Sequence, residues 1–154
     1  HRAGTENVAG IVGMAAALKE SCAHIYENAS FVTVLRDHLR EGLLQIPGCR
    51  WNGDAVNRLP GNANVSFSGI EGESLLLMLD MQGICVSSGS ACTTGAVDPS
   101  HVLKAIGLSD NEAKGSLRLT LDRENTEQEV DTLIHIISET VQKLRNMNPF
   151  WKET

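Results

Sequence analysis

The chain has 154 residues, of which 42% are hydrophobic and 21% charged, and its formal net charge is -6 at pH 7. These values are typical of one globular domain with a buried core, and they argue against a disordered chain and against nucleic-acid binding, which needs clustered Lys and Arg. No apolar run approaches the roughly 20 residues of a membrane span, and the first residues lack a secretory signal, so we expect a cytoplasmic protein without a membrane partner.

The first predicted element covers residues 8–44, where apolar residues recur at the spacing of one helix face. Thr5 or Asn7 can cap its first turn, and Gly42 or the dipeptide at residues 47–48 can end it. The pattern predicts one long helix or two helices in series. Its apolar positions are Ile11, Met14, Ala15, Leu18, Cys22, Ile25, Phe31, Leu35, Leu39 and Leu43.

The pattern then changes to short segments separated by Gly, Asn and Pro. Residues 49–51 and 63–67 alternate with the period of two expected of half-buried strands, with a loop at residues 58–61 between them. The Leu and Met content of residues 75–81 predicts a helix with a buried face, which stops at Gly83.

The middle of the chain combines a short β-rich run with a polar loop. The run covers residues 84–87, and residues 88–95 are too small and too polar for a core, so they predict a loop. Pro99 suits the first turn of a short helix that reaches Ile106 and is closed by Gly107.

The last two predicted elements are a strand and a long helix. Residues 116–120 alternate as a strand, and Thr126 with Glu129 forms a capping box that starts a helix running to about Met147. The apolar face of that helix is Val130, Leu133, Ile134, Ile137, Val141 and Leu144. Together the elements predict an α+β fold, in which a small, mainly antiparallel sheet is packed with helices and preceded by a long helix.

Cys92 is the candidate nucleophile among the four cysteines. It stands in a run of Ser, Gly, Ala and Thr, and such polar, uncrowded surroundings favour a reactive thiolate, while glycines allow the backbone to move. An ordinary small loop residue is the alternative interpretation. Cys22, Cys49 and Cys85 form no C-x-x-C pair and the histidines are dispersed, so neither a metal site nor a disulfide is expected.

Arg118 is the candidate anion-binding residue. It alternates with Leu117 and Leu119 on a predicted strand, so its side chain points to the face opposite to theirs. A guanidinium that faces a cleft suits a bidentate clamp on a carboxylate. A solvated or ion-paired strand arginine is the alternative interpretation.

Several motifs occur together in a fixed order. They are Arg-Ala-Gly-Thr-Glu-Asn-Val at residues 2–8 with Gly-Ile-Val-Gly at 10–13, Ser-Ser-Gly-Ser-Ala-Cys at 87–92, and Ser-Leu-Arg at 116–118. The combination closely resembles the NifS/IscS-type cysteine desulfurases of group I. The resemblance extends from His1 to about the end of the last predicted helix and leaves out the tail.

This resemblance implies a class V aminotransferase and a fold-type I pyridoxal-phosphate enzyme. Such enzymes are homodimers that convert L-cysteine to L-alanine and leave a persulfide on an enzyme cysteine. The matching residues are Cys92 for the sulfur-accepting thiol, Arg118 for the substrate carboxylate, and Thr5 for the cofactor phosphate of the partner subunit. A group I loop implies delivery of the persulfide to an iron-sulfur scaffold or another sulfur-acceptor protein.

The resemblance also divides the chain. Residues 1–22 correspond to a remnant of the large cofactor domain with the connecting helix, and residues 23–154 to the C-terminal small domain that carries the cysteine loop. The family's Schiff-base lysine lies upstream of the first motif, and no lysine here has a matching context. We therefore expect this chain alone to be inactive.

Two other interpretations stay open. A selenocysteine lyase or a kynureninase-like enzyme belongs to the same aminotransferase branch, although the latter does not require the cysteine of the Ser-Ser-Gly-Ser-Ala-Cys run. A non-catalytic module that accepts persulfide or docks on a scaffold also fits the sequence.

Overall fold

Three strands form one antiparallel sheet in the order β1-β2-β3. The strands are β1 (Cys49–Trp51), β2 (Asn62–Phe67) and β3 (Ser116–Thr120). The computed structural model describes residues 3–88 and 99–151, and within them the register pairs Trp51 with Val65 and Val65 with Leu117. The three strands predicted from alternation are confirmed, and β2 begins one residue earlier than expected.

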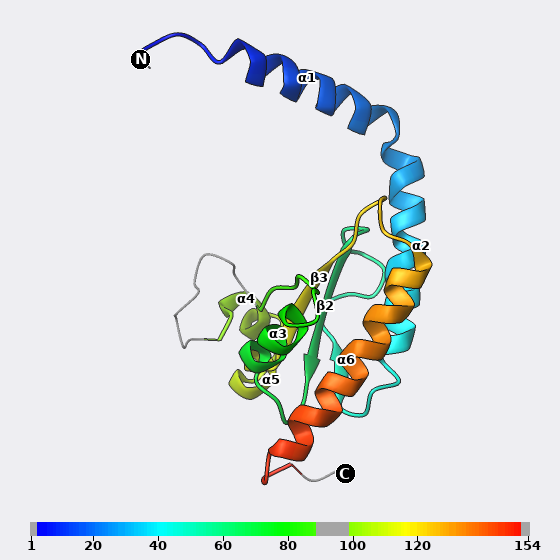
Figure 1. Cartoon of the computed structure of the whole chain (residues 1–154), viewed down its shortest axis with the longest axis vertical. Coiled ribbons are helices and arrows are strands. Elements are labelled where there is room, and N and C mark those ends of the chain that lie inside the picture. The colour runs from blue at the N-terminus through cyan, green and yellow to red at the C-terminus, as the bar shows by residue number, and fades with distance from the viewer. Residues whose placement is uncertain (1–2, 89–98, 152–154) are drawn as a thin grey trace.

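Three helices pack on one face of this sheet (Figure 1): α2 (Ile25–Leu43), α3 (Gly72–Asp80) and α6 (Glu127–Met147). Every second strand side chain points toward them, because successive side chains of a strand alternate between faces. The predicted α+β fold is therefore confirmed. The centre of the shared core consists of side chains that are at most 1% exposed: Leu39, Leu43, Ala63, Val65, Phe67, Leu75, Leu79, Leu117, Val130, Ile137 and Val141.

Helix α1 (Val8–Ala23) precedes α2 and extends away from the sheet (Figure 1). The two helices are bent by 70° relative to each other, so the long helical region is two helices in series. No residue of α1 is buried, and its apolar face has no partner among the described residues. Within the part of the chain that the structure describes, no single helix is long and apolar enough to cross a membrane, and α1 and α2 meet that criterion only as a bent pair.

The segment at residues 84–87 is a bridge rather than the predicted β-rich run. Only Ser87 pairs with β3, as an isolated bridge to Arg118. Gly83 has a φ of 77°, and the amide of Ile84 donates to the carbonyl of Leu79 at 3.0 Å. This is the Schellman arrangement that closes α3. The amide of Ile84 is therefore bonded to the end of α3 and is not available to pair with a neighbouring strand.

Two short helices connect this region to β3. Helix α4 (His101–Ala105) has Ser100 as its N-cap, so Pro99 precedes the helix instead of lying in its first turn. Gly107 ends it with a φ of 91°, as expected. Helix α5 (Asp110–Lys114) was absent from the sequence prediction, although Ser109 and Glu112 form a complete capping box there. The two helices share a small core of Leu103, Leu108 and Ala113.

Helix α6 begins at the predicted capping box and ends in a docked tail. The hydroxyl of Thr126 accepts from the amide of Glu129, whose carboxylate accepts from the amide of Thr126. Beyond α6, the ring of Trp151 lies against Gly69 and 4.3 Å from the guanidinium carbon of Arg145. A side chain at Gly69 would overlap that ring. The end of the chain is thereby fastened to the turn that follows β2.

The packing of the core predicts that replacing a buried leucine lowers the free energy of unfolding much more than replacing an exposed leucine. Leu39→Ala removes a side chain that is 0% exposed, and we expect a loss of about 2–5 kcal/mol in the free energy of unfolding, measured by chemical denaturation and circular dichroism. The control is Leu59→Ala, at a residue that is 75% exposed, for which we expect a change within about 0.5 kcal/mol. Equal losses in the two variants would contradict this packing.

Candidate functional site

Arg118 lies on the face of the sheet opposite to α2, α3 and α6. Its neighbours Leu117 and Leu119 are 0% and 3% exposed and face the core, whereas Arg118 is half-buried on the other side. The predicted orientation of the guanidinium is confirmed. Among the described residues, its nitrogens have neither a hydrogen bond nor an ion pair.

Backbone pairing brings two polar residues beside Arg118. The amide of Arg118 donates to the carbonyl of Ser87 at 2.6 Å, and the amide of Ser87 donates back at 3.1 Å. Because Arg118 uses both backbone groups toward Ser87, its β2 partner Asn64 is in a non-hydrogen-bonded pair, the kind in which side chains lie closer. Asn64 and Ser87 were not identified from the sequence as neighbours of Arg118. Only the strand register places them next to the arginine, and the sequence pattern does not reveal that register.

A second arginine on the same face is already paired. Arg50 on β1 places Nη1 2.6 Å from a carboxylate oxygen of Glu112. Hydrogen bonds from Ser109, and then from Arg50, lower the pKa of Glu112 to about 2, so this carboxylate is charged at neutral pH. Within the described part of the chain, Arg118 has no comparable partner. Of these two arginines, Arg118 is the one available to an external anion.

The predicted nucleophile, Cys92, lies outside the described residues, and its role stays a prediction. The three remaining cysteines are described. Cys22 and Cys85 are exposed, and Cys49 is half-buried on β1. Burial raises the pKa of the Cys49 thiol to about 12, and the nearby charge of Arg145 offsets only part of that effect. Cys49 is therefore held as a neutral thiol.

Thr5 is exposed and lies just before α1. Of the two capping residues that the sequence allowed, Asn7 takes the role, because its Oδ1 accepts from the amide of Gly10 at 3.0 Å. The hydroxyl of Thr5 stays outside this cap, and an exposed hydroxyl before a helix N-terminus fits a phosphate oxygen. Since α1 leads away from the sheet (Figure 1), a single chain does not bring Thr5 and Arg118 together.

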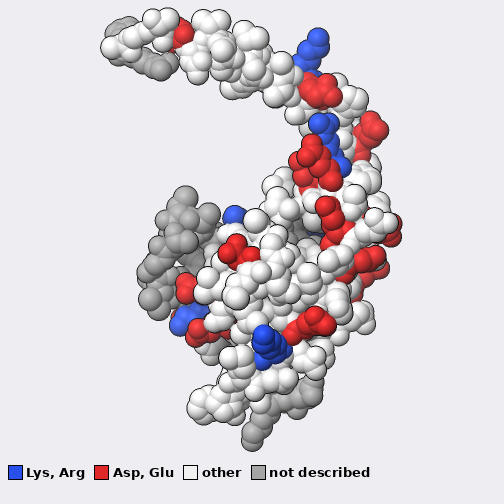
Figure 2. Space-filling model, in the orientation of Figure 1, with Lys and Arg blue, Asp and Glu red and all other residues white. Residues whose placement is uncertain are grey.

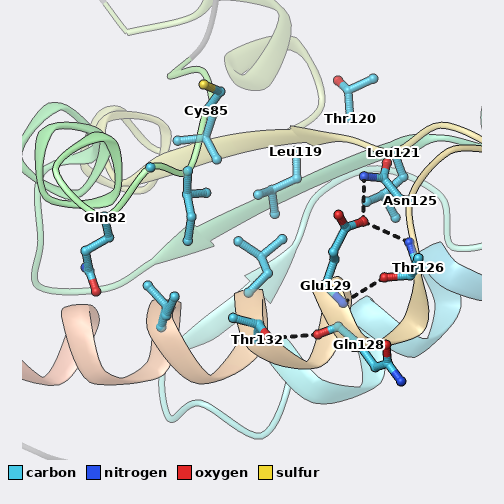
Figure 3. A pocket seen from close by; sticks show the side chains of 15 residues that line it. Gln82, Cys85, Leu119, Thr120, Leu121, Asn125, Thr126, Gln128, Glu129 and Thr132 are labelled. Atoms are coloured by element: carbon cyan, nitrogen blue, oxygen red, sulfur yellow. Dashed lines mark hydrogen bonds between the residues drawn. The ribbon is translucent and has the colours of Figure 1, made fainter.

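A groove of about 500 Å³ lies between residues 82–86, the end of β3 and α6 (Figure 3). Its floor is apolar, and its polar rim is used by the cap of α6. The carboxylate of Glu129 accepts from the amide of Thr126 and from Asn125, and these bonds lower its pKa. Figure 3 shows the sulfur of Cys85 pointing away from α6. Arg118 does not line this groove, so we place the candidate site on the sheet face that carries Arg118, opposite to α2, α3 and α6.

The surface charges gather elsewhere than on α1. Figure 2 shows Asp and Glu side chains over the bend after α1 and along α2 and α6, whereas most of α1 is uncharged. Three described histidines, His24, His38 and His135, lie beside carboxylates, as in the 2.6 Å contact between His38 and Asp131. No group of His, Cys, Asp and Glu side chains able to hold a metal ion occurs within residues 3–88 and 99–151.

Comparison with known proteins gives a consistent result. The family model described as aminotransferase class V matches residues 1–133. A cysteine desulfurase of Gluconacetobacter diazotrophicus is 48% identical over 97% of this chain, and the cysteine desulfurase IscS of Methanosarcina thermophila is 51% identical over 96% of it. A solved structure of a NifS-like protein has a TM-score of 0.81 and 35% identity over 93% of the chain. The chain spans 38%, 37% and 36% of the lengths of these three proteins.

The cysteines predict an order of reaction with iodoacetamide. A pKa of about 12 instead of 9.0 lowers the thiolate fraction of Cys49 near neutral pH by roughly a thousandfold, so we expect Cys49 to react last. Cys22 and Cys85 should react faster, and Cys92 fastest. Peptide mass spectrometry after timed labelling measures the four rates.

The pH dependence and a denatured control complete this test. Burial raises the pKa of Cys49 in the folded chain from 9.0 to about 12. The contribution of the neutral thiol to the free energy of unfolding is therefore complete below pH 9 and is lost as the pH rises from 9 toward 12. In denaturant all four cysteines should react alike. Rapid labelling of native Cys49, or a Cys92 that reacts no faster than Cys22 and Cys85, would contradict the assignment.

Proposed function

The chain belongs to the aminotransferase class V family, and on that premise we propose that it supplies the sulfur-accepting thiol and the carboxylate-binding arginine of a cysteine desulfurase. The observation that carries the proposal is the guanidinium of Arg118, which is half-buried on the sheet face opposite to the main core and has no partner among the described residues. The relatives named cysteine desulfurase support the choice of reaction.

Arg118 binds the carboxylate of L-cysteine in this proposal. The guanidinium can donate two parallel hydrogen bonds to a carboxylate, which fixes both the position and the orientation of the amino acid. Because β3 is held between β2 and Ser87, the strand presents the arginine from a rigid support. The backbone position of Arg118 is therefore set before the substrate binds, and only its side chain has to be ordered.

Cys92 accepts the sulfur. Its thiolate attacks the sulfur of the bound L-cysteine, the new S–S bond forms, and the C–S bond breaks with its electron pair left on carbon. That carbon takes a proton and becomes the methyl group of L-alanine, while Cys92 carries the persulfide. The Gly and Ser residues around Cys92 suit a thiol that must then reach an iron-sulfur scaffold or another sulfur-acceptor protein.

Pyridoxal phosphate is the cofactor that the family implies, and it supplies an electron sink for the amino acid. On this chain, the exposed hydroxyl of Thr5 before α1 is the group that would hold its phosphate. Thr5 precedes α1, which leads away from the sheet that carries Arg118 (Figure 1), so a site that uses both residues requires two subunits. We therefore propose a homodimer.

The rest of the enzyme would come from sequence that this chain does not contain. The chain spans 38% of the length of a desulfurase relative, and no lysine in it has the context of the cofactor-binding lysine. The exposed apolar side chains of α1, such as Ile11, Met14 and Leu18, suit contact with a larger domain. We propose that this chain alone is inactive and that the complete protein acts in the cytoplasm.

Substitutions in a protein of the relatives' full length test this function. We expect Cys92→Ser to lower the release of sulfide and L-alanine from L-cysteine by roughly a thousandfold or more, since the nucleophile is lost. Arg118→Ala should raise the KM for L-cysteine by about 10- to 100-fold, the value of hydrogen bonds to a charged group.

A matched control separates these effects from general damage. Arg50→Ala removes the other arginine of the same sheet face, and we expect it to leave KM unchanged within about twofold, because Arg50 is bound to Glu112. Full activity of the Cys92→Ser variant would contradict the desulfurase assignment and favour a selenocysteine lyase.

A further inference from the structure

A buried amide controls the side chain next to Arg118. Asn52 follows β1, is 2% exposed, and lies on the same sheet face as Asn64 and Ser66. Its Nδ2 donates to Oδ1 of Asn64 at 2.7 Å and to the hydroxyl of Ser66 at 2.8 Å. Its backbone amide also donates to the carbonyl of Asn64 at 2.9 Å. Asn64 is therefore held by two hydrogen bonds from one buried residue.

This arrangement decides which end of the Asn64 amide is free. Oδ1 is occupied by Asn52, so the NH2 group is the end that remains, and it has no acceptor among the described residues. Asn64 and Arg118 form a non-hydrogen-bonded cross-strand pair, in which directly opposite Cβ atoms lie about 4.5–5.5 Å apart. Two sets of N–H donors without acceptors thus lie side by side on one face.

We propose that Asn64 is a second carboxylate-binding residue, whose NH2 group and the Arg118 guanidinium bind the same substrate carboxylate, and that Asn52 is the positioning residue that orients it. The proposal rests on the proposed function and adds to it. A neutral amide donates a hydrogen bond without adding charge, so it improves the fit for a carboxylate while leaving the ionic attraction to Arg118.

Comparison with Asn62 shows that only the amide of Asn64, of these two residues, lies beside the guanidinium of Arg118. Asn62 lies on the same strand and the same face, but it pairs with Thr120, and its Oδ1 accepts from Nη2 of Arg58 at 3.2 Å. It therefore lies beside a threonine and not beside an arginine without a partner. Asn62→Ala is the matched control, because it removes the same amide two residues away.

Steady-state kinetics on a protein of the relatives' full length give the first test. Asn64→Ala should raise the KM for L-cysteine about tenfold, with kcat changed less than about threefold. Asn64→Asp should raise KM further, because its carboxylate keeps the bond from Asn52 but repels the substrate and pairs with Arg118. Asn62→Ala should leave KM within about twofold.

The order of the two Asn64 variants distinguishes binding from structure. A purely structural residue would tolerate the isosteric aspartate better than alanine, which is the reverse of our expectation. A KM for Asn64→Asp at or below that of Asn64→Ala, or an unchanged KM in Asn64→Ala, would overturn the proposal.

A binding measurement on this chain separates the proposal from the proposed function. In 1H–15N spectra with increasing acetate, the side-chain NH2 of Asn64 and the Nε–H of Arg118 should shift together with one dissociation constant, while the NH2 of Asn62 stays in place. If the full-length protein does not turn over L-cysteine but these signals shift together, the desulfurase assignment fails and the carboxylate site stands. If Arg118 shifts without Asn64, the proposal fails whatever the enzyme does.

Discussion

The alternation of β3 between a buried and an open face is the constraint on which the site depends. Leu117 and Leu119 lie in the core formed with α2, α3 and α6, so a slip of one residue would bury Arg118 and expose both leucines. Pairing with β2 on one side and the Ser87 bridge on the other fix the same register. The apolar contacts of Leu117 and Leu119 on one face of the sheet thereby determine that the side chain of Arg118 lies on the opposite face.

This arrangement gives the proposed carboxylate-binding residue a fixed backbone, whereas the proposed nucleophile, Cys92, lies outside the described residues. The carboxylate anchor sits on a strand within the core of the domain, where its position is fixed by packing. The proposed nucleophile belongs to a Gly- and Ser-rich segment that follows Ser87 directly in the sequence. An amino acid held at a rigid site can then be approached by a thiol that also has to reach an acceptor protein. Within the described residues no side chain of α1 is buried, and the chain spans 38% of the length of a desulfurase relative.

Local signals in the sequence predicted most elements, and non-local pairing explains the rest. The capping box of Thr126 and Glu129 fixed the start of α6, whereas the equivalent box of Ser109 and Glu112 begins a helix too short for periodicity to reveal. The proposed role of Arg118 followed from alternation and resemblance, but that of Asn64 depends on Asn52, which contacts it from the end of the neighbouring strand β1. Nothing in the apolar spacing of α1 showed that its face would find no partner in the described chain, because periodicity reports a face and not its neighbour.

In the proposed reaction, sulfur from a cysteine bound by Arg118 passes to Cys92. Peptide mass spectrometry of the full-length protein, after brief exposure to L-cysteine and alkylation without reductant, tests it most directly. We expect one added sulfur atom on the peptide that contains Cys92, and about 10- to 100-fold less of that product in an Arg118→Ala protein exposed for the same time to L-cysteine well below its KM. Added sulfur on Cys22, Cys49 or Cys85 in its place, or sulfide release with no sulfur found on Cys92 at any time, would contradict it.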